Sequence, residues 1–334
     1  MAERHKNNER IELFSKAALD VHPIFQPEED YERLFQAIRE DKLVVFFGAG
    51  VSRLAGCLSW AELACKIVNT FPNDVFTQQE KEILRNLAWK DPRRVISICY
   101  TRTQLRDDLK DIYYSAIKKS VTPPDNRQPE FSNIHTKLAR LKALSYVTTN
   151  IDRGMESAKP IGDERVLPFN LTTLDKFDAR DLRNGNIFYL HGSTDDLEKT
   201  IFTANHYHKF YNSMNTPVKH FLENLFSGDL TVLFIGYGLE EQEILHSIFT
   251  SNVSETPGLK EPRHFLLAPV YSSQLAEFNL KNMFLDIYSV KAIPYFIDYE
   301  GYERLFNVLD ALQKLIEDKK IPPIQIRDLM SGDL

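Results

Sequence analysis

The sequence predicts an α/β fold, with a Rossmann-like open, mainly parallel sheet, helices on both faces and an added helical subdomain. Short apolar runs rich in Val, Ile and Phe recur along the chain, and they alternate with amphipathic segments. Continuous apolar runs of this length are typical of strands that are buried on both faces of a parallel sheet. Several runs end in glycine or small polar residues, as expected at the carboxyl edge of such a sheet, where ligands bind.

The first apolar run, Leu43 to Phe47, ends in the segment Gly48-Ala49-Gly50-Val51-Ser52. This order predicts a strand, a tight loop and a helix. Gly48 and Gly50 let the backbone turn and approach a phosphate, and N–H groups at a helix start favour an anion. Ser52 is expected to donate to that phosphate, to cap the helix, or both. A glycine pair that only turns the chain is the alternative interpretation at this point.

Helical segments are predicted on both sides of this loop. A helix is expected over 31–40, and residues 58–141 are expected to be helical because apolar positions recur at helical spacing. The periodic stretches are 60–68, 83–89 and 95–117. Pro123 and Pro124 mark an exposed linker that returns the chain to the sheet.

Three later apolar runs predict strands that end in chemically distinctive residues. They are 143–149, followed by Asn150 and Asp152; 187–190, followed by His191; and 232–235, followed by Gly236-Tyr237-Gly238. Because parallel strands end along one edge of their sheet, these tips and the loop after Phe47 are expected to converge on one crevice.

The rest of the chain completes the predicted sheet. Two further strands are expected at 265–268 and 292–296, with a helix over 272–284 between them. A helix over 305–315 follows, because its apolar positions recur three and four residues apart. No internal repeat interrupts this pattern.

For several other polar residues, the sequence predicts structural or surface positions and no functional role. His135, which precedes the second tip, is expected to be structural. His206 and His208 lie two apart on an expected helix and do not share a face, so a metal-binding pair is not expected. Arg93, Arg94 and Arg102 are expected on the solvated face of the helical segment, with an interface as the alternative.

Taken in order, the segments G-A-G-V-S, T-T-N-I-D, L-H-G and G-Y-G-L-E resemble the sirtuin family. More narrowly, they resemble the bacterial sirtuin-like (SIR2-type) branch that hydrolyses NAD in anti-phage defence. The resemblance runs from about residue 43 to about residue 317. It implies an enzyme, a gated NAD+ hydrolase that releases ADP-ribose and nicotinamide.

The resemblance also implies roles for residues at the four tips. Asn150 would hold the ribose and the reactive water, Asp152 would hydrogen-bond the nicotinamide carboxamide, and His191 would be the general base. An imidazole suits this role because its ordinary pKa of about 6.5 leaves much of it neutral at cytosolic pH. The residues expected to bind the cofactor are Gly48, Ala49, Gly50, Ser52, Thr149, Gly236, Tyr237 and Gly238.

Sirtuin deacylases carry a small zinc module held by four cysteines, and this sequence departs from that pattern. Its three cysteines, Cys57, Cys65 and Cys99, include no C-x-x-C pair and cannot build a four-thiolate site. The predicted helices of 58–141 stand in place of the module. We therefore expect NAD+ as substrate, with no zinc and no other metal.

The expected organisation is an N-terminal arm (1–30), a sirtuin-like domain (31–317) with a helical insertion at about 58–141, and a C-terminal tail (318–334). An NAD+ hydrolase without control would drain the cofactor of its host, and no segment resembles a separate sensor domain. We therefore expect control by homo-oligomerisation or by a partner protein. The resemblance implies a HerA-type ATPase as that partner, and the arm and tail are the expected contact segments.

Charge and composition exclude several other classes. Lys and Arg total 41 against 47 for Asp and Glu, and the net charge of −6 argues against nucleic acid as a directly recognised ligand. Three unpaired cysteines favour a reducing compartment. The sequence has no apolar stretch of about 20 residues and no apolar signal-peptide core near Met1. We expect a cytoplasmic protein that does not enter a membrane.

Two other functions stay open at this point. A lysine deacylase or ADP-ribosyl transferase would use the same NAD+ pocket with an added acceptor groove, although the missing zinc module counts against it. A non-catalytic sensor would bind NAD+ or a related nucleotide, but it has no need of a base such as His191. The choice between NAD+ and NADP+ is open as well, as is a lid function for residues 60–141.

Overall fold

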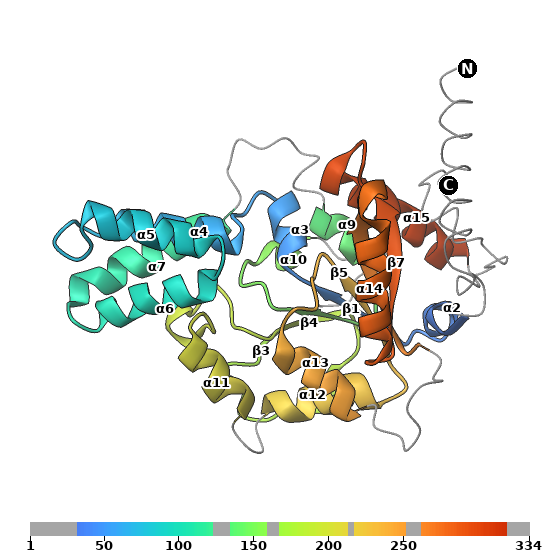
Figure 1. The fold of residues 1–334 in the computed structure, drawn as a ribbon. Coiled ribbons are helices and arrows are strands. Elements are labelled where there is room, and N and C mark those ends of the chain that lie inside the picture. Colours follow the sequence, from blue (N-terminus) through green and yellow to red (C-terminus); the bar gives the residue numbers. More distant parts are fainter. Residues whose placement is uncertain (1–31, 123–133, 159–166, 213–216, 252–261, 319–334) are drawn as a thin grey trace. The chain divides into compact units, whose positions relative to one another are not determined.

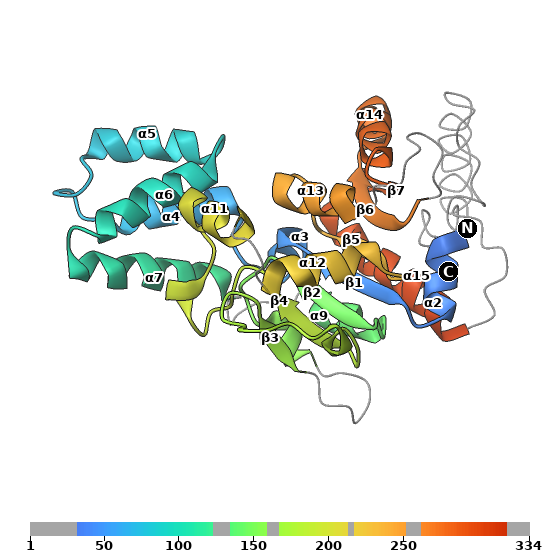
Figure 2. The ribbon, with the colours of Figure 1, turned by 90° about the horizontal axis from the view of Figure 1, so that it is seen from below.

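The computed structural model describes residues 32–122, 134–158, 167–212, 217–251 and 262–318. Within them, seven strands form one open parallel sheet in the order β3-β4-β2-β1-β5-β6-β7 (Figures 1 and 2). The predicted α/β fold class is therefore confirmed, and the sheet is wholly parallel. The expected arm and nearly all of the expected tail lie outside the described residues.

The strands agree closely with the apolar runs of the sequence. They are β1 (Leu43–Phe47), β2 (Ser145–Thr148), β3 (Pro168–Asn170), β4 (Asn186–Tyr189), β5 (Thr231–Ile235), β6 (His264–Val270) and β7 (Val290–Phe296). Strands β1, β2, β4 and β5 are buried along their whole length, as expected where both faces of a parallel sheet are covered. The sequence does not predict β3, because three residues are too few for a recognisable apolar run.

The helices are α2 (Glu32–Arg39), α3 (Ala49–Leu54), α4 (Trp60–Thr70), α5 (Gln78–Ala88), α6 (Pro92–Thr103), α7 (Asp107–Val121), α9 (Ile134–Arg140), α10 (Gly154–Ser157), α11 (Ala204–Asn212), α12 (Pro217–Ser227), α13 (Gln242–Ser251), α14 (Leu275–Asp286) and α15 (Arg304–Asp318). The predicted helical stretch 95–117 is two helices, α6 and α7. Helix α7 begins with Asp107 and Asp108, and acidic side chains are favoured in a first helical turn. None of the described helices is long and apolar enough to span a membrane.

The chain folds into two compact units, each built from more than one segment. The first unit contains the described residues up to Phe46, residues 140–144 and the described residues from Leu225 onward. The second unit contains residues 47–139 and 145–224, again where they are described.

In the first unit, strands β5, β6 and β7 pair in parallel register. Phe234 lies opposite Leu266, and Leu267 lies opposite Ile293. Helices α14 and α15 both pack against β7, and they cover opposite faces of it (Figure 2). Strand β7 is therefore covered on both faces.

In the second unit, β2 and β3 pair in parallel with β4, and a bundle of four helices follows the first loop. Helices α4 to α7 lie side by side around a common apolar core (Figures 1 and 2). Ile67, Val95 and Ile117 are fully buried in that core, and Phe202 packs into it. Ser59 begins α4 with a reciprocal capping box, because its side chain and that of Glu62 each bond the other's main chain. The bundle is the helical subdomain expected from the sequence.

Candidate functional site

Three of the four predicted tips lie in the second unit, and hydrogen bonds join two of them. Asn150, two residues after β2, donates from Nδ2 to the carbonyl oxygen of Gly48 at 2.8 Å. Thr148, at the end of β2, donates from Oγ1 to the carbonyl of Phe47 at 2.9 Å. The same Oγ1 accepts from the backbone N–H of Asn150 at 3.0 Å. The loops that follow β1 and β2 are thereby fixed against each other.

Asp152 is a buried carboxylate, 6% exposed, with a hydrogen-bond donor on each oxygen. Ser52 donates from Oγ to Oδ2 at 2.5 Å, and the backbone N–H of Gly154 donates to Oδ1 at 3.0 Å. The Nε2 atom of His135 lies 3.5 Å from Oδ1. A buried carboxylate needs such partners, and here they fix its orientation.

His135 lies on α9 and, at 4% exposed, is buried beside Asp152. A Cβ atom at Gly154 would lie 2.2 Å from Cε1 of His135, so this approach requires glycine at position 154. Burial lowers the pKa of His135, although the charge of Asp152 acts in the opposite direction. The sequence expectation of a structural histidine misses this contact, because spacing along the chain does not show which residue the imidazole faces.

His191 follows β4 and is almost wholly buried, at 1% exposed. Its Nε2 atom lies 2.7 Å from the hydroxyl oxygen of Tyr211, and its Nδ1 atom lies 3.3 Å from that of Tyr207. The rings of Tyr207, Phe210 and Tyr211 surround the imidazole with centroid distances of 4.8, 6.4 and 5.9 Å. These three residues lie on one face of α11, since they are spaced three and four apart.

Burial lowers the pKa of His191 to about 3. The charge of Arg93 also lowers this pKa, and a hydrogen bond from the ring to the main chain of Thr149 raises it. The imidazole is therefore neutral at ordinary pH. The guanidinium carbon of Arg93 lies 3.8 Å from the ring centroid of Tyr207, so the expectation that Arg93 only faces solvent is wrong.

The remaining predicted residues of the first loop take positions in and around α3. This helix begins at Ala49, with Gly48 as its N-cap residue, and Gly50 follows in its first turn. Ser52 lies inside the helix, so the expectation that it caps the helix is wrong. Thr149 is buried between Thr148 and Asn150.

The fourth predicted tip, Gly236-Tyr237-Gly238, follows β5 and belongs to the first unit. Gly236 has a φ of +58°, which glycine adopts without strain. The ring of Tyr237 packs against Phe46 at 4.9 Å and against Phe234 at 6.0 Å between centroids. A Cβ atom at Gly238 would contact the side chain of Glu240 at 3.2 Å.

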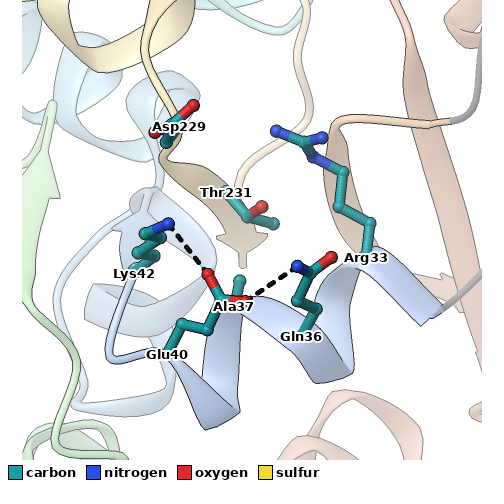
Figure 3. Close-up of a pocket in the computed structure, with 7 residues that line it drawn as sticks. All are labelled: Arg33, Gln36, Ala37, Glu40, Lys42, Asp229 and Thr231. Carbon is teal, nitrogen blue, oxygen red and sulfur yellow. Dashed lines mark hydrogen bonds and ion pairs between the residues drawn. The ribbon is translucent and has the colours of Figure 1, made fainter.

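The first unit also has a hollow of about 150 Å³ between α2 and the start of β5 (Figure 3). Its lining residues are Arg33, Gln36, Ala37, Glu40, Lys42, Asp229 and Thr231. Lys42 pairs with Glu40 at 2.8 Å, and Gln36 donates to Glu40 at 2.8 Å (Figure 3). None of the predicted site residues lines this hollow.

Among the described residues, no three His, Cys, Asp or Glu side chains gather in a way that could hold a metal ion. Cys57, Cys65 and Cys99 form no disulfide bond.

Comparison with known proteins identifies the region that contains Asn150, Asp152 and His191. Residues 144–293 match the SIR2-like domain. NAD(+) hydrolase ThsA of Bacillus cereus (strain MSX-D12) is 22% identical over 276 residues, which cover 75% of this chain and 52% of that protein. NAD(+) hydrolase ThsA of Cytobacillus dafuensis is 24% identical over 227 residues, which cover 64% of this chain and 38% of that protein.

The matched region spans about half of the first relative and 38% of the second. The domain match begins one residue before β2 and ends within β7, so it includes three of the four predicted tips. The chain therefore carries a SIR2-like domain and is a distant homologue of these two bacterial proteins.

Proposed function

We propose that the chain is an NAD+ hydrolase, which converts NAD+ and water to ADP-ribose and nicotinamide. The observation that carries this proposal is the position of Ser52, Asn150, Asp152 and His191, all in the second unit on segments that follow β1, β2 and β4. The distant homology to two proteins named as NAD(+) hydrolases supports the choice of substrate.

The proposed reaction breaks the bond between the ribose C1′ and the nicotinamide nitrogen. The electron pair leaves with nicotinamide, the ribose gains oxocarbenium character, and a water oxygen forms the new bond to C1′. The proton of that water passes to a base and then to solvent. The site must hold the leaving amide and position the water on the open face of the sugar.

In this proposal Asn150 holds the ribose and the water, and its bond to Gly48 fixes the plane of its amide. Asp152 accepts hydrogen bonds from the nicotinamide carboxamide. An ionised carboxylate has about four acceptor positions, so donors from Ser52 and Gly154 leave capacity for this contact. His191 is the general base, and its lowered pKa keeps it unprotonated.

The proposed cofactor contacts include the first loop and the fourth tip. Gly48, Ala49, Gly50 and Thr149 would line the ribose and phosphates, while Ser52 would act by supporting Asp152. Gly236, Tyr237 and Gly238 are also proposed as cofactor-binding residues, for the adenosine ribose.

We further propose that the hydrolase is a gated effector in anti-phage defence, a homo-oligomer controlled by a partner of the HerA ATPase type. The physical argument is that unregulated loss of NAD+ would harm the host, and the burial of His191 supports an inactive resting state. The proposed effector has a sirtuin-like domain (31–317) with a helical insertion at about 58–141. Residues 1–30 and 318–334 are the proposed segments that contact other subunits or the partner.

The test is NAD+ consumption by the purified full chain, with nicotinamide and ADP-ribose separated by chromatography. His191→Ala and Asn150→Ala are compared with His208→Ala, an exposed histidine of α11. His191→Ala should lose roughly a hundredfold or more of the wild-type rate, because general bases contribute at least this much. Asn150→Ala should also lower the rate, because the ribose and the water would no longer be held in position. The His208 variant should keep the wild-type rate.

Absence of turnover by the wild type, alone and with the candidate ATPase, would rule out the hydrolase if NAD+ still binds. Turnover that requires an acyl-lysine peptide would instead favour a deacylase.

A further inference from the structure

The acceptor nitrogen of His191 is already engaged in the structure. A neutral imidazole has one donor nitrogen and one acceptor nitrogen. The hydroxyl of Tyr211 lies 2.7 Å from Nε2, and that of Tyr207 lies 3.3 Å from Nδ1. A tyrosine hydroxyl therefore faces each ring nitrogen, whichever of the two carries the proton. A substrate hydroxyl or water cannot reach Nε2 while Tyr211 stays there.

We propose that Tyr211 is an autoinhibitory residue, whose phenolic hydroxyl occupies the place of the substrate hydroxyl or water that His191 deprotonates. The inference rests on the proposed function, because it assigns a regulation to the proposed base. A phenol and a ribose hydroxyl offer the same kind of O–H donor, so one can replace the other at Nε2.

The aromatic face of α11 completes the cover over His191. Tyr207 and Phe210 flank the imidazole on the same helix face as Tyr211, and Tyr207 is itself only 2% exposed. Solvent exposure of His191 is 1%, so substrate needs a displacement of Tyr211 or of the helix that carries it.

Helix α6 of the bundle holds α11 in this position through three contacts. Ser97 accepts the backbone N–H of Ala204 at 3.1 Å, at the start of α11. Tyr100 meets the ring of His206 edge-on at 4.9 Å, and Arg93 stacks on Tyr207 at 3.8 Å. A trigger that shifts the bundle would therefore withdraw the cover from His191, which gives the helical subdomain a regulatory role.

The test compares Tyr211→Phe with the wild type and with Tyr302→Phe, which removes an exposed phenol of the first unit. Two quantities are measured without any partner: the rate of nicotinamide release and the affinity for ADP-ribose, which presents the ribose hydroxyls. Tyr211→Phe should raise both by roughly tenfold or less, since one hydrogen bond to His191 is lost from the closed state. Tyr302→Phe should change neither.

Arg93→Gln is a second variant that leaves Tyr211 intact but removes the stacking on Tyr207. Like Tyr211→Phe, it should raise both the rate of nicotinamide release and the affinity for ADP-ribose. The increase in rate should vanish when His191→Ala is added to Tyr211→Phe.

The outcomes separate this inference from the proposed function. Tighter ADP-ribose binding by Tyr211→Phe with no turnover in any variant would uphold the inference and reject the hydrolase. A wild-type rate that Tyr211→Phe leaves unchanged or lowers would uphold the hydrolase and overturn the inference, because Tyr211 would then be neutral or assist catalysis.

Discussion

Ser52 and Ser145 are two buried serines of the second unit that differ in their hydrogen bonding. Ser52 donates to Asp152 at 2.5 Å, whereas the hydroxyl of Ser145 has no hydrogen-bond partner among the described residues. Truncation to alanine therefore removes a partner of a buried carboxylate in one case and an unbonded hydroxyl in the other.

We expect Ser52→Ala to lower the free energy of unfolding by about 1–3 kcal/mol, the cost of leaving a buried polar group without its donor. Ser145→Ala should be close to neutral. Urea denaturation of both variants gives the comparison. An equal effect of the two substitutions would show that the bond to Asp152 contributes nothing to stability.

Gly154 and His135 form a second pair of contacting residues, whose contribution to stability can be tested by substitution. Gly154→Ala should destabilise the protein by about 1–3 kcal/mol, because the added methyl group overlaps the imidazole. His135→Ala opens the space, so the double variant should be more stable than the sum of the two single effects predicts. Additive effects in thermal unfolding would contradict the close approach.

The positions of Asn150, Asp152 and His191 just after strand ends are predictable from sequence, because buried strands leave recognisable apolar runs. Their roles at the site remain proposals. The places of His135 and Tyr211 are not predictable, because they depend on how α9 and α11 pack against those strand ends. The partner of the Ser52 hydroxyl is not predictable either, because Asp152 lies 100 residues further along the chain.

The start of helix α4 is stabilised by hydrogen bonds between residues close together in the sequence. Ser59 and Glu62 close the capping box that begins this helix, and α4 packs against α5, α6 and α7. A cap of this kind satisfies backbone N–H groups that have no partner inside the helix.

Ser59→Ala should lower stability by about 1 kcal/mol. Thr101→Ala, on an exposed part of α6, should cost nothing, because alanine is the better helix former there. Circular dichroism during thermal unfolding reports both. A cost at Thr101 equal to that at Ser59 would mean that the cap is not the cause.

The apolar pattern of the sequence predicts most strands but not every helix boundary. Six of the seven strands were predictable because their burial on both faces leaves a continuous apolar run. The break between α6 and α7 was not, because Val95 to Ile117 keeps a nearly regular apolar spacing across it. Helices α12 and α13 have no counterpart among the predicted helices, although α12 begins with Pro217, a residue favoured at the first helical position.

For the whole molecule, buried histidines couple stability to pH. Burial lowers the pKa of His191 and that of His264 to about 3, one in each unit. In the unfolded chain both would titrate near pH 6.5. Between about pH 6.5 and 3 the unfolded state therefore binds more protons than the folded state, so stability is fully present above pH 6.5 and falls as the pH is lowered.

We expect each histidine to contribute up to about 1.4 kcal/mol of lost stability per pH unit in this window. The midpoints of urea unfolding at pH 7, 6 and 5 measure the combined effect of the two histidines on stability. His264→Gln should make stability depend less steeply on pH. A midpoint that stays constant from pH 7 to 5 would contradict the neutral, buried state of these side chains.

The path of the chain through the two units has a consequence for its synthesis. The chain passes between the units after Phe46, Ala139, Leu144 and Asn224, and residues 225–318 supply β5, β6 and β7 to the first unit. At ordinary translation rates these residues follow about 5–20 s after Asn224. Because α11 directly follows the segment with His191 and is complete before Asn224, Tyr211 leaves the ribosome together with the base that it covers. Under both proposals, a nascent chain is restrained from the moment its site assembles, and no active hydrolase is released during translation.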